Sequence, residues 1–140
     1  MLEPFIEASD TSVADFISQV PETKRQLDAQ LLQQLMTRIT GEEAKMWGKE
    51  VIGFSSYRNT HKTGREWDWP VLSFALEPGR LVIFVMTGFD ELEKPLRQLG
   101  KNKVSSHCLY IKTLSDIDMN ILETLLETVY KDMKKKYQCA

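Results

Sequence analysis

The chain has 140 residues, of which 42% are hydrophobic and 27% charged, and its formal net charge is −2. This composition predicts one globular domain, residues 1–140, and the near-neutral charge disfavours nucleic acid as a partner. No apolar run approaches the roughly 20 residues that cross a membrane, and no secretory leader is recognisable, so we expect a cytoplasmic protein.

The first forty residues predict two helices. Thr11 or Ser12 is placed to cap a short helix, and Ser12 with Asp15 has the spacing of a capping box. Gly41, a residue typical of helix C-termini, follows a longer apolar stripe at helical spacing. The stripe consists of Leu27, Leu31, Leu32, Leu35, Met36 and Ile39.

From residue 45 onward the apolar pattern changes to the period of strands. We expect strands at 45–47, 51–59, 71–76, 81–86 and 105–112. Pro78 and Gly79 occupy the central positions of a type II turn between the third and the fourth of these strands. Short turns join most of the strands, which favours antiparallel pairing.

Two more helices are expected in the second half of the chain. Asp90 is placed to cap a short helix that ends at Gly100. Ser115 and Asp118 form a capping box for a long C-terminal helix, whose apolar stripe reaches Met133.

These elements predict the fold class α+β. We expect two layers, an antiparallel sheet of about five strands flanked by N-terminal helices and a long C-terminal helix. Because helices at both ends of the chain would cover one face of the sheet, the other face is left to solvent, a ligand or a second subunit.

Six short segments follow one another in a characteristic order and spacing. They are Met46-Trp47-Gly48, Ile52-Gly53-Phe54 with Tyr57, Gly64-Arg65-Glu66 with Asp68-Trp69, Gly88-Phe89-Asp90, Leu99-Gly100-Lys101 with Lys103, and Cys108-Leu109-Tyr110-Ile111-Lys112 followed by Asp116-Ile117-Asp118. Together they resemble the YdhG-like family of small bacterial proteins of unknown function, although Trp67 stands where that family usually has a small residue. The resemblance implies a frataxin-like or secretion-chaperone-like layout of helices on an antiparallel sheet. Some members are described as intracellular iron chaperones, and no agreed catalytic residues come with the family.

Aromatic and charged residues crowd the polar turn around residues 61–65 and its flanks. The candidates for ligand binding there are Tyr57, Arg58, His61, Arg65, Trp67, Asp68 and Trp69. The cationic side chains suit a phosphate or a carboxylate, and the aromatic rings suit a flat ring system. The alternative interpretation is that Trp69 anchors the core and that the charged tip is solvated.

Two other groups of charged residues have both a functional and a structural interpretation. Glu66 and Asp68 share one face of a strand, and two carboxylates so placed suit a cation. In the structural interpretation, Arg65 instead forms an ion pair that stabilises the hairpin. Lys101 and Lys103 form a basic edge that suits an anion or an acidic partner, or that blunts an edge strand.

Iron handling, which the resemblance implies, would use carboxylates on the terminal helices because hard cations prefer oxygen ligands. The metal-ligand candidates are Asp116, Asp118, Glu123 and Glu127, together with Glu3, Glu7, Asp10 and Asp15 near the N-terminus. These carboxylates converge if the terminal helices pack side by side, and otherwise they line a solvated helix face.

The sequence favours a binding protein over an enzyme, because it has no recognisable phosphate loop, nucleophile elbow or metal triad. The leading hypothesis is a frataxin-like iron-handling role, with weakly bound iron and an iron–sulphur assembly partner. One alternative is binding of an anion or a small metabolite by the hairpin of residues 58–69. Another is an interaction module without a ligand, such as a homodimer through the uncovered sheet face.

Overall fold

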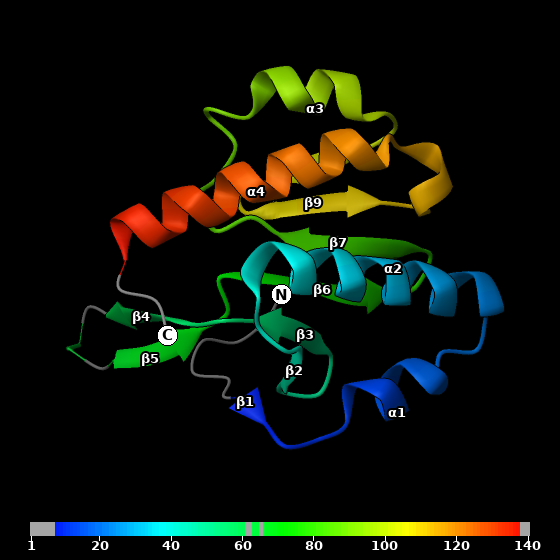
Figure 1. The fold of residues 1–140 in the computed structure, drawn as a ribbon, viewed down its shortest axis with the longest axis horizontal. Helices are drawn as coiled ribbons and strands as arrows, with labels where there is room; N and C mark the ends of the chain where they lie inside the picture. Colours follow the sequence, from blue (N-terminus) through cyan, green and yellow to red (C-terminus); the bar gives the residue numbers. More distant parts are fainter. Residues whose placement is uncertain (1–7, 61–62, 65, 138–140) are drawn as a thin grey trace.

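The computed structural model describes residues 8–60, 63–64 and 66–137 of the chain (Figure 1). Within these ranges, seven strands form one antiparallel sheet in the order β1-β2-β3-β6-β7-β9-β8. They are β1 (Ala8–Ser9), β2 (Lys45–Trp47), β3 (Val51–Phe54), β6 (Leu72–Glu77), β7 (Arg80–Phe84), β8 (Lys103–Ser105) and β9 (Cys108–Ile111). Two further strands, β4 (Tyr57–Thr60) and β5 (Glu66–Trp69), form a separate hairpin.

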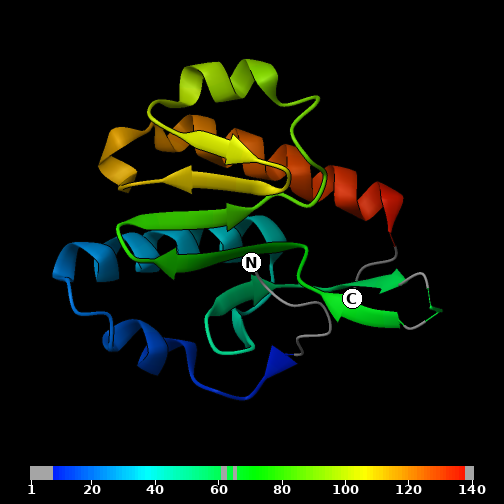
Figure 2. The same ribbon diagram turned by 180° about the vertical axis from the view of Figure 1, so that it is seen from behind.

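The helices confirm the predicted two-layer α+β arrangement. They are α1 (Val13–Ser18), α2 (Thr23–Thr40), α3 (Glu93–Leu99), the short 3₁₀ helix η1 (Leu114–Asp116) and α4 (Met119–Lys136). The long helices α2 and α4 lie on one face of the sheet, and the view from behind shows the strands in front of them (Figure 2). None of the described helices is long and apolar enough to cross a membrane.

The prediction of about five strands was wrong, because the main sheet has seven within the described ranges. The two additional strands, β1 and β8, have two and three residues and lie at the edges of the sheet. Strands this short are set by pairing with a neighbour, and they carry too few residues to show an alternating pattern.

The predicted single strand at 51–59 is divided into β3 and β4 by a sharp change of direction. Ser55 has a φ of 59°, which is the left-handed region that side-chain-bearing residues seldom adopt. The chain therefore leaves the main sheet after Phe54, forms the β4–β5 hairpin, and returns where Val71 N donates to Phe54 O at 3.1 Å. This excursion places the hairpin beside the sheet rather than within it (Figures 1 and 2).

The main core lies between the sheet and the long helices. Alternate residues of each strand point toward α2 and α4, because successive side chains of a strand face opposite sides. The fully buried ones on this side include Ile52, Phe54, Phe74, Ile83 and Leu109. They pack with Leu32, Met36, Leu122, Leu125, Leu126 and Val129 of the two helices.

The ends of the helices confirm some predictions and correct others. Ser12 Oγ accepts a hydrogen bond from Asp15 N at 3.1 Å, and Gly41 ends α2 with a φ of 71°, both as predicted. The predicted Ser115–Asp118 box is wrong: Ser115 belongs to η1, and Asp118 is itself the N-cap of α4. The cap predicted at Asp90 is also wrong, because α3 starts after Leu92 without a side-chain cap.

Candidate ligand-binding site

The β4–β5 hairpin carries most of the predicted binding residues and separates them onto two faces. Its register pairs Tyr57 with Trp69 and Arg58 with Asp68. Directly paired residues point to the same side, and neighbours along a strand point to opposite sides. One face of the hairpin is therefore aromatic and the other is charged. His61 and Arg65, also predicted to bind, lie outside the described residues.

The charged face of the hairpin is an ion-pair network centred on Arg58. Arg58 Nε donates to Asp68 Oδ1 at 2.7 Å, and Arg58 Nη1 donates to Glu66 Oε2 at 3.1 Å. The hydrogen bond to Asp68, followed by the charge of that carboxylate, raises the pKa of Arg58 above its ordinary value. Glu66 and Asp68 thus share one face as predicted, and the cation between them is Arg58. Both carboxylates compete with any ligand anion for this guanidinium.

The aromatic face of the hairpin is attached to the rest of the protein by stacking contacts. Tyr57 is buried, and its ring lies 4.7 Å from the ring of Tyr137, just beyond the end of α4. Trp67, one pair further along the hairpin, is half-buried. Tyr57 therefore holds the hairpin against the end of α4, and Trp69, its partner in the hairpin, contacts aromatic rings of the main sheet.

Three aromatic rings meet where the hairpin joins the side of the sheet opposite α2 and α4. Trp69 contacts Trp47 edge-to-face, with ring centroids 6.2 Å apart, and contacts Phe84 in the same manner at 6.3 Å. We call Trp47, Trp69 and Phe84 the aromatic junction. Trp47 and Trp69 are buried, whereas Phe84 is half-buried and forms the side of the junction nearest solvent.

A row of directly paired residues forms the base of the aromatic junction. Gly53 of β3 pairs with Ser73 of β6, and Ser73 pairs with Phe84 of β7, so all three face the same side of the sheet. A Cβ atom on Gly53 would lie 2.6 Å from Cδ1 of Trp47, which shows that this indole covers the glycine. Trp69 contacts both the ring over Gly53 and the ring of Phe84, and Ser73 lies between Gly53 and Phe84 in this row.

Two polar atoms are buried in this apolar junction without a partner. Among the residues that the structure describes, Trp69 Nε1 and Ser73 Oγ have no hydrogen-bond partner. Ser73 is fully buried, and 7% of Trp69 is exposed. A buried polar group without a hydrogen bond costs about 1–3 kcal/mol, and such groups are uncommon in folded proteins. The indole N–H and the hydroxyl O–H are both donors, so each of them requires an acceptor.

We expect Gly53→Ala to lower the free energy of unfolding by about 1–3 kcal/mol, because the added methyl group would overpack the junction. The added Cβ would meet Pro70 Cβ and Trp47 Cδ1, each at 2.6 Å. Urea denaturation followed by tryptophan fluorescence measures the loss. Combining this change with Trp47→Leu should make the second substitution cost less than it does alone; strictly additive effects would contradict the contact.

The two predicted lysines lie away from the hairpin. Lys101 and Lys103 are exposed, and Lys103 belongs to β8, at the edge of the sheet. Strands β7 and β9 separate β8 from β6, so neither lysine is brought to the charged face of the hairpin. Their position agrees with the structural interpretation, in which lysines protect an edge strand from pairing with another chain.

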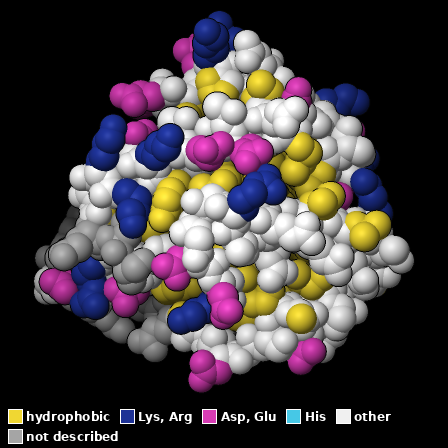
Figure 3. Space-filling model, viewed as in Figure 1, with side chains coloured by type: hydrophobic (Ala, Val, Ile, Leu, Met, Phe, Trp, Pro, Cys, Tyr) yellow, Lys and Arg dark blue, Asp and Glu magenta, His cyan; other side chains and the backbone are white. Residues whose placement is uncertain are grey.

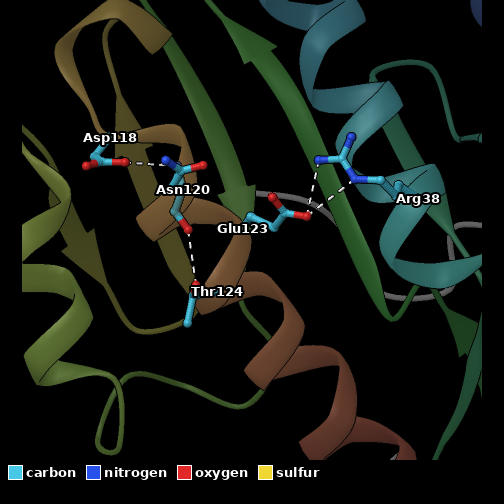
Figure 4. Close-up of polar contacts among 5 residues, drawn as sticks. All are labelled: Arg38, Asp118, Asn120, Glu123 and Thr124. Carbon is cyan, nitrogen blue, oxygen red and sulfur yellow. Dashed lines mark hydrogen bonds and ion pairs between the residues drawn. The ribbon is translucent and has the colours of Figure 1, made fainter.

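Within the part of the chain that the structure describes, the predicted iron ligands do not converge on one site. Asp118 accepts hydrogen bonds from the backbone of Asn120 and Ile121 at 2.9 and 3.3 Å, at the start of α4 (Figure 4). Glu123 instead points toward α2, where Arg38 Nη2 donates to it at 3.2 Å (Figure 4).

The remaining carboxylates do not complete a site. Asp116 is half-buried in η1 and Glu127 is exposed on α4, while Asp10 and Asp15 lie around α1. Acidic and basic side chains are interspersed on the helix-bearing face (Figure 3). In the described ranges no group of three or more His, Cys, Asp or Glu side chains is placed to hold a metal ion. The candidates Glu3 and Glu7 lie outside those ranges.

A shallow groove on the outer side of α2 is a weaker candidate site. It encloses about 390 Å³ and is lined by Gln30, Gln33, Gln34, Thr37 and Arg38. All of these residues come from one helix, so no second element closes the groove around a ligand. Its one cation, Arg38, is already paired with Glu123.

Comparisons of this chain with protein-family models, with curated proteins and with solved structures found no match. The assignment of a site therefore depends on the geometry of the described residues. Of the residues predicted from the sequence, Trp69 lies at the place where buried donors and aromatic rings meet.

Sequence reasoning missed Gly53, Ser73 and Phe84 as parts of a site. Gly53 carried a usable signal, because a glycine inside a strand often marks the close approach of another group. Ser73 carried a second signal, as the hydroxyl residue within the otherwise apolar run 71–76. Neither signal identifies which ring covers the residue, since Trp47, Trp69 and Phe84 come from three separate strands.

Proposed function

We propose that this protein binds a small organic molecule at the aromatic junction. The observation that carries the proposal is the pair of buried donors, Trp69 Nε1 and Ser73 Oγ, which have no acceptor among the described residues. A ligand with an apolar body and an acceptor oxygen would contact the rings and complete both hydrogen bonds. This combination of apolar walls with a few directed polar groups is typical of small-molecule sites.

The arrangement of the hairpin suggests how a ligand would enter. The β4–β5 hairpin is a separate sheet, joined to the main sheet by residues 55–56 on one side and 70–71 on the other. Trp69 lies at the end of β5, so a small rotation of the hairpin about these connections moves its ring away from Ser73. Because Phe84 is half-buried, a ligand would enter from solvent on its side of the junction. Binding would then replace contacts between the rings with contacts to the ligand.

The test uses Ser73→Ala, which removes one buried donor and little volume. Because the hydroxyl has no partner, we expect the unfolding free energy of the free protein to stay unchanged or to rise by up to about 1 kcal/mol. We expect the same variant to weaken the stabilisation that a bound metabolite gives the wild type. Thermal unfolding against a metabolite panel measures both effects, since a ligand at 100 times its Kd adds about 2.7 kcal/mol.

Ser105→Ala is the matched control. Ser105 lies on the same side of the sheet, in the same row as Phe84, but it is exposed and its Oγ lies 3.0 Å from the hydroxyl of Tyr110. This control should retain the response to ligand. A loss of stability in Ser73→Ala larger than in the control would contradict the proposal, as would a wild type that responds to no member of the panel.

Membership of the YdhG-like family stays a prediction from the sequence, as do the iron-handling role and the iron–sulphur assembly partner. The placement of Asp118 and Glu123 gives iron handling no support of its own, so we rank it second. A homodimer through the sheet face opposite α2 and α4 also stays a prediction. Anaerobic titration with ferrous iron and light scattering over a range of protein concentrations would test these two ideas separately.

A further inference from the structure

We infer that the ligand of the aromatic junction is a monocarboxylate with an apolar or aromatic body, and that Lys45 neutralises its charge. This inference depends on the proposed function, and it adds the chemical class of the ligand. Three observations support it: the row of residues that contains Ser73, the charges on that side of the sheet, and the acceptor that the buried donors require.

The row at the base of the junction ends in a lysine. Lys45 of β2 pairs with Gly53, and Gly53 pairs with Ser73, so Lys45 and Ser73 face the same side two strands apart. Adjacent strands are about 4.8 Å apart, which separates the two backbones by roughly 10 Å. The flexible four-carbon stem of lysine covers much of that distance. Gly53, which lies between them, is covered by the indole of Trp47 and by Pro70, so the ammonium group of Lys45 would meet a ligand at the rim of the junction.

Lys45 is also free to meet an anion. It is exposed, and no acidic group in the described part of the chain forms an ion pair with it. Arg58, by contrast, is held by Glu66 and Asp68. Lys45 is therefore a better counter-ion for a ligand at the junction than the arginine of the hairpin.

The strands present a basic bias on this side of the sheet, although the whole chain is slightly acidic. The charged strand residues facing this side are Lys45, Glu77, Arg80 and Lys103, as their pairing shows. Arg80 Nε donates to Glu77 at 2.8 Å, and the Arg80 guanidinium lies 4.0 Å from the ring centroid of Tyr110. The Glu77–Arg80 pair is thus neutral. Lys103 lies on β8, three strands away from β6, so Lys45 is the strand cation that remains near the junction, and its charge favours an anionic ligand over a cationic one.

The chemistry of the donors selects among anions. One carboxylate oxygen accepts from Trp69 Nε1–H and Ser73 Oγ–H, and the second oxygen faces the ammonium group of Lys45 at the rim. The apolar body that carries the carboxylate then packs against the rings of Trp47 and Phe84. A phosphate would bring more charge and more oxygens into an apolar site than two donors and one lysine can satisfy.

The experiment compares three carboxylates with their neutral primary amides. The probes are benzoate, phenylacetate and indole-3-acetate, each beside its amide, titrated into the wild type and followed by the indole N–H signals in ¹H–¹⁵N NMR spectra. Trp69→Phe identifies the Trp69 signal. We expect at least one carboxylate to shift that signal and to bind about tenfold more tightly than its amide, since a charge-assisted contact is lost in the amide.

Two lysine variants provide the matched comparison. Lys45→Gln should remove the preference for carboxylate over amide, whereas Lys49→Gln should retain it. Lys49 is an exposed residue in the β2–β3 turn, so both variants change the net charge equally.

Each outcome distinguishes this inference from the proposed function. Equal binding of acid and amide, or an unchanged preference in Lys45→Gln, would overturn the carboxylate assignment and leave ligand binding at the junction intact. If no probe of either kind moves the Trp69 signal, both the assignment and binding at the junction are contradicted.

Discussion

Gly100→Ala is expected to lower the free energy of unfolding by about 4 kcal/mol, the largest effect of any single substitution considered for this protein. Gly100 has a φ of 120° and a ψ of −155°, a conformation open essentially to glycine alone. An added Cβ would collide with the carbonyl oxygen of Asp116 and lie 3.0 Å from Cα of Ile117. These are backbone atoms, so no side-chain rotation relieves the contact.

The location of Gly100 explains why this strain would spread. Gly100 ends α3 and forms an isolated bridge with Ile117, immediately before α4 begins. Next to it, Asp118 N donates to Leu99 O at 2.8 Å. A displaced residue 100 would therefore disturb both the end of α3 and the residue that caps α4.

Gly41→Ala separates the conformational contribution from the collision. Gly41 also has a positive φ, 71°, but a Cβ there would meet nothing within 4 Å. Alanine at this helix end should therefore cost only about 1 kcal/mol. Urea denaturation of the two variants measures the difference, and equal losses would show that the contact with residues 116–117 contributes nothing.

Asp28→Ala is expected to lower the free energy of unfolding by about 3 kcal/mol, because it leaves buried donors without an acceptor. Asp28 lies on α2, and its Oδ2 accepts hydrogen bonds from Thr113 Oγ1 at 3.0 Å and from Leu114 N at 3.2 Å. Only 3% of its side chain is exposed. This carboxylate joins α2 to the start of η1, across 85 residues of sequence. Chemical denaturation monitored by circular dichroism measures the loss.

Lys24→Met tests whether the ion pair of Asp28 shares in this stabilisation. Lys24 Nζ lies 3.5 Å from the other oxygen, Oδ1, in an ion pair without a hydrogen bond. Because 57% of the Lys24 side chain is exposed, its loss should cost less than about 1 kcal/mol. A loss as large as that of Asp28→Ala would show that charge neutralisation, and not capping of η1, is the main role of Asp28.

Local patterns in the sequence were sufficient for most of the helices and for the turn between β6 and β7. The apolar stripe before Gly41 predicted α2 because helical spacing alone puts those residues on one face. Pro78 and Gly79 predicted the turn because each supplies a backbone conformation that the turn requires, and Gly79 has a φ of 77°. The errors at Asp90 and at Ser115 concern capping, where several polar residues compete for one helix end.

The sequence by itself therefore determined the two-layer α+β class, since apolar periodicity fixes which face of each element is buried. Only the tertiary structure decided the candidate site. The left-handed backbone at Ser55 turns the hairpin out of the sheet, and that turn brings Trp69 into contact with both Trp47 and Phe84. Local periodicity carries no information about this meeting, because it joins segments far apart in the chain whose approach is set by packing.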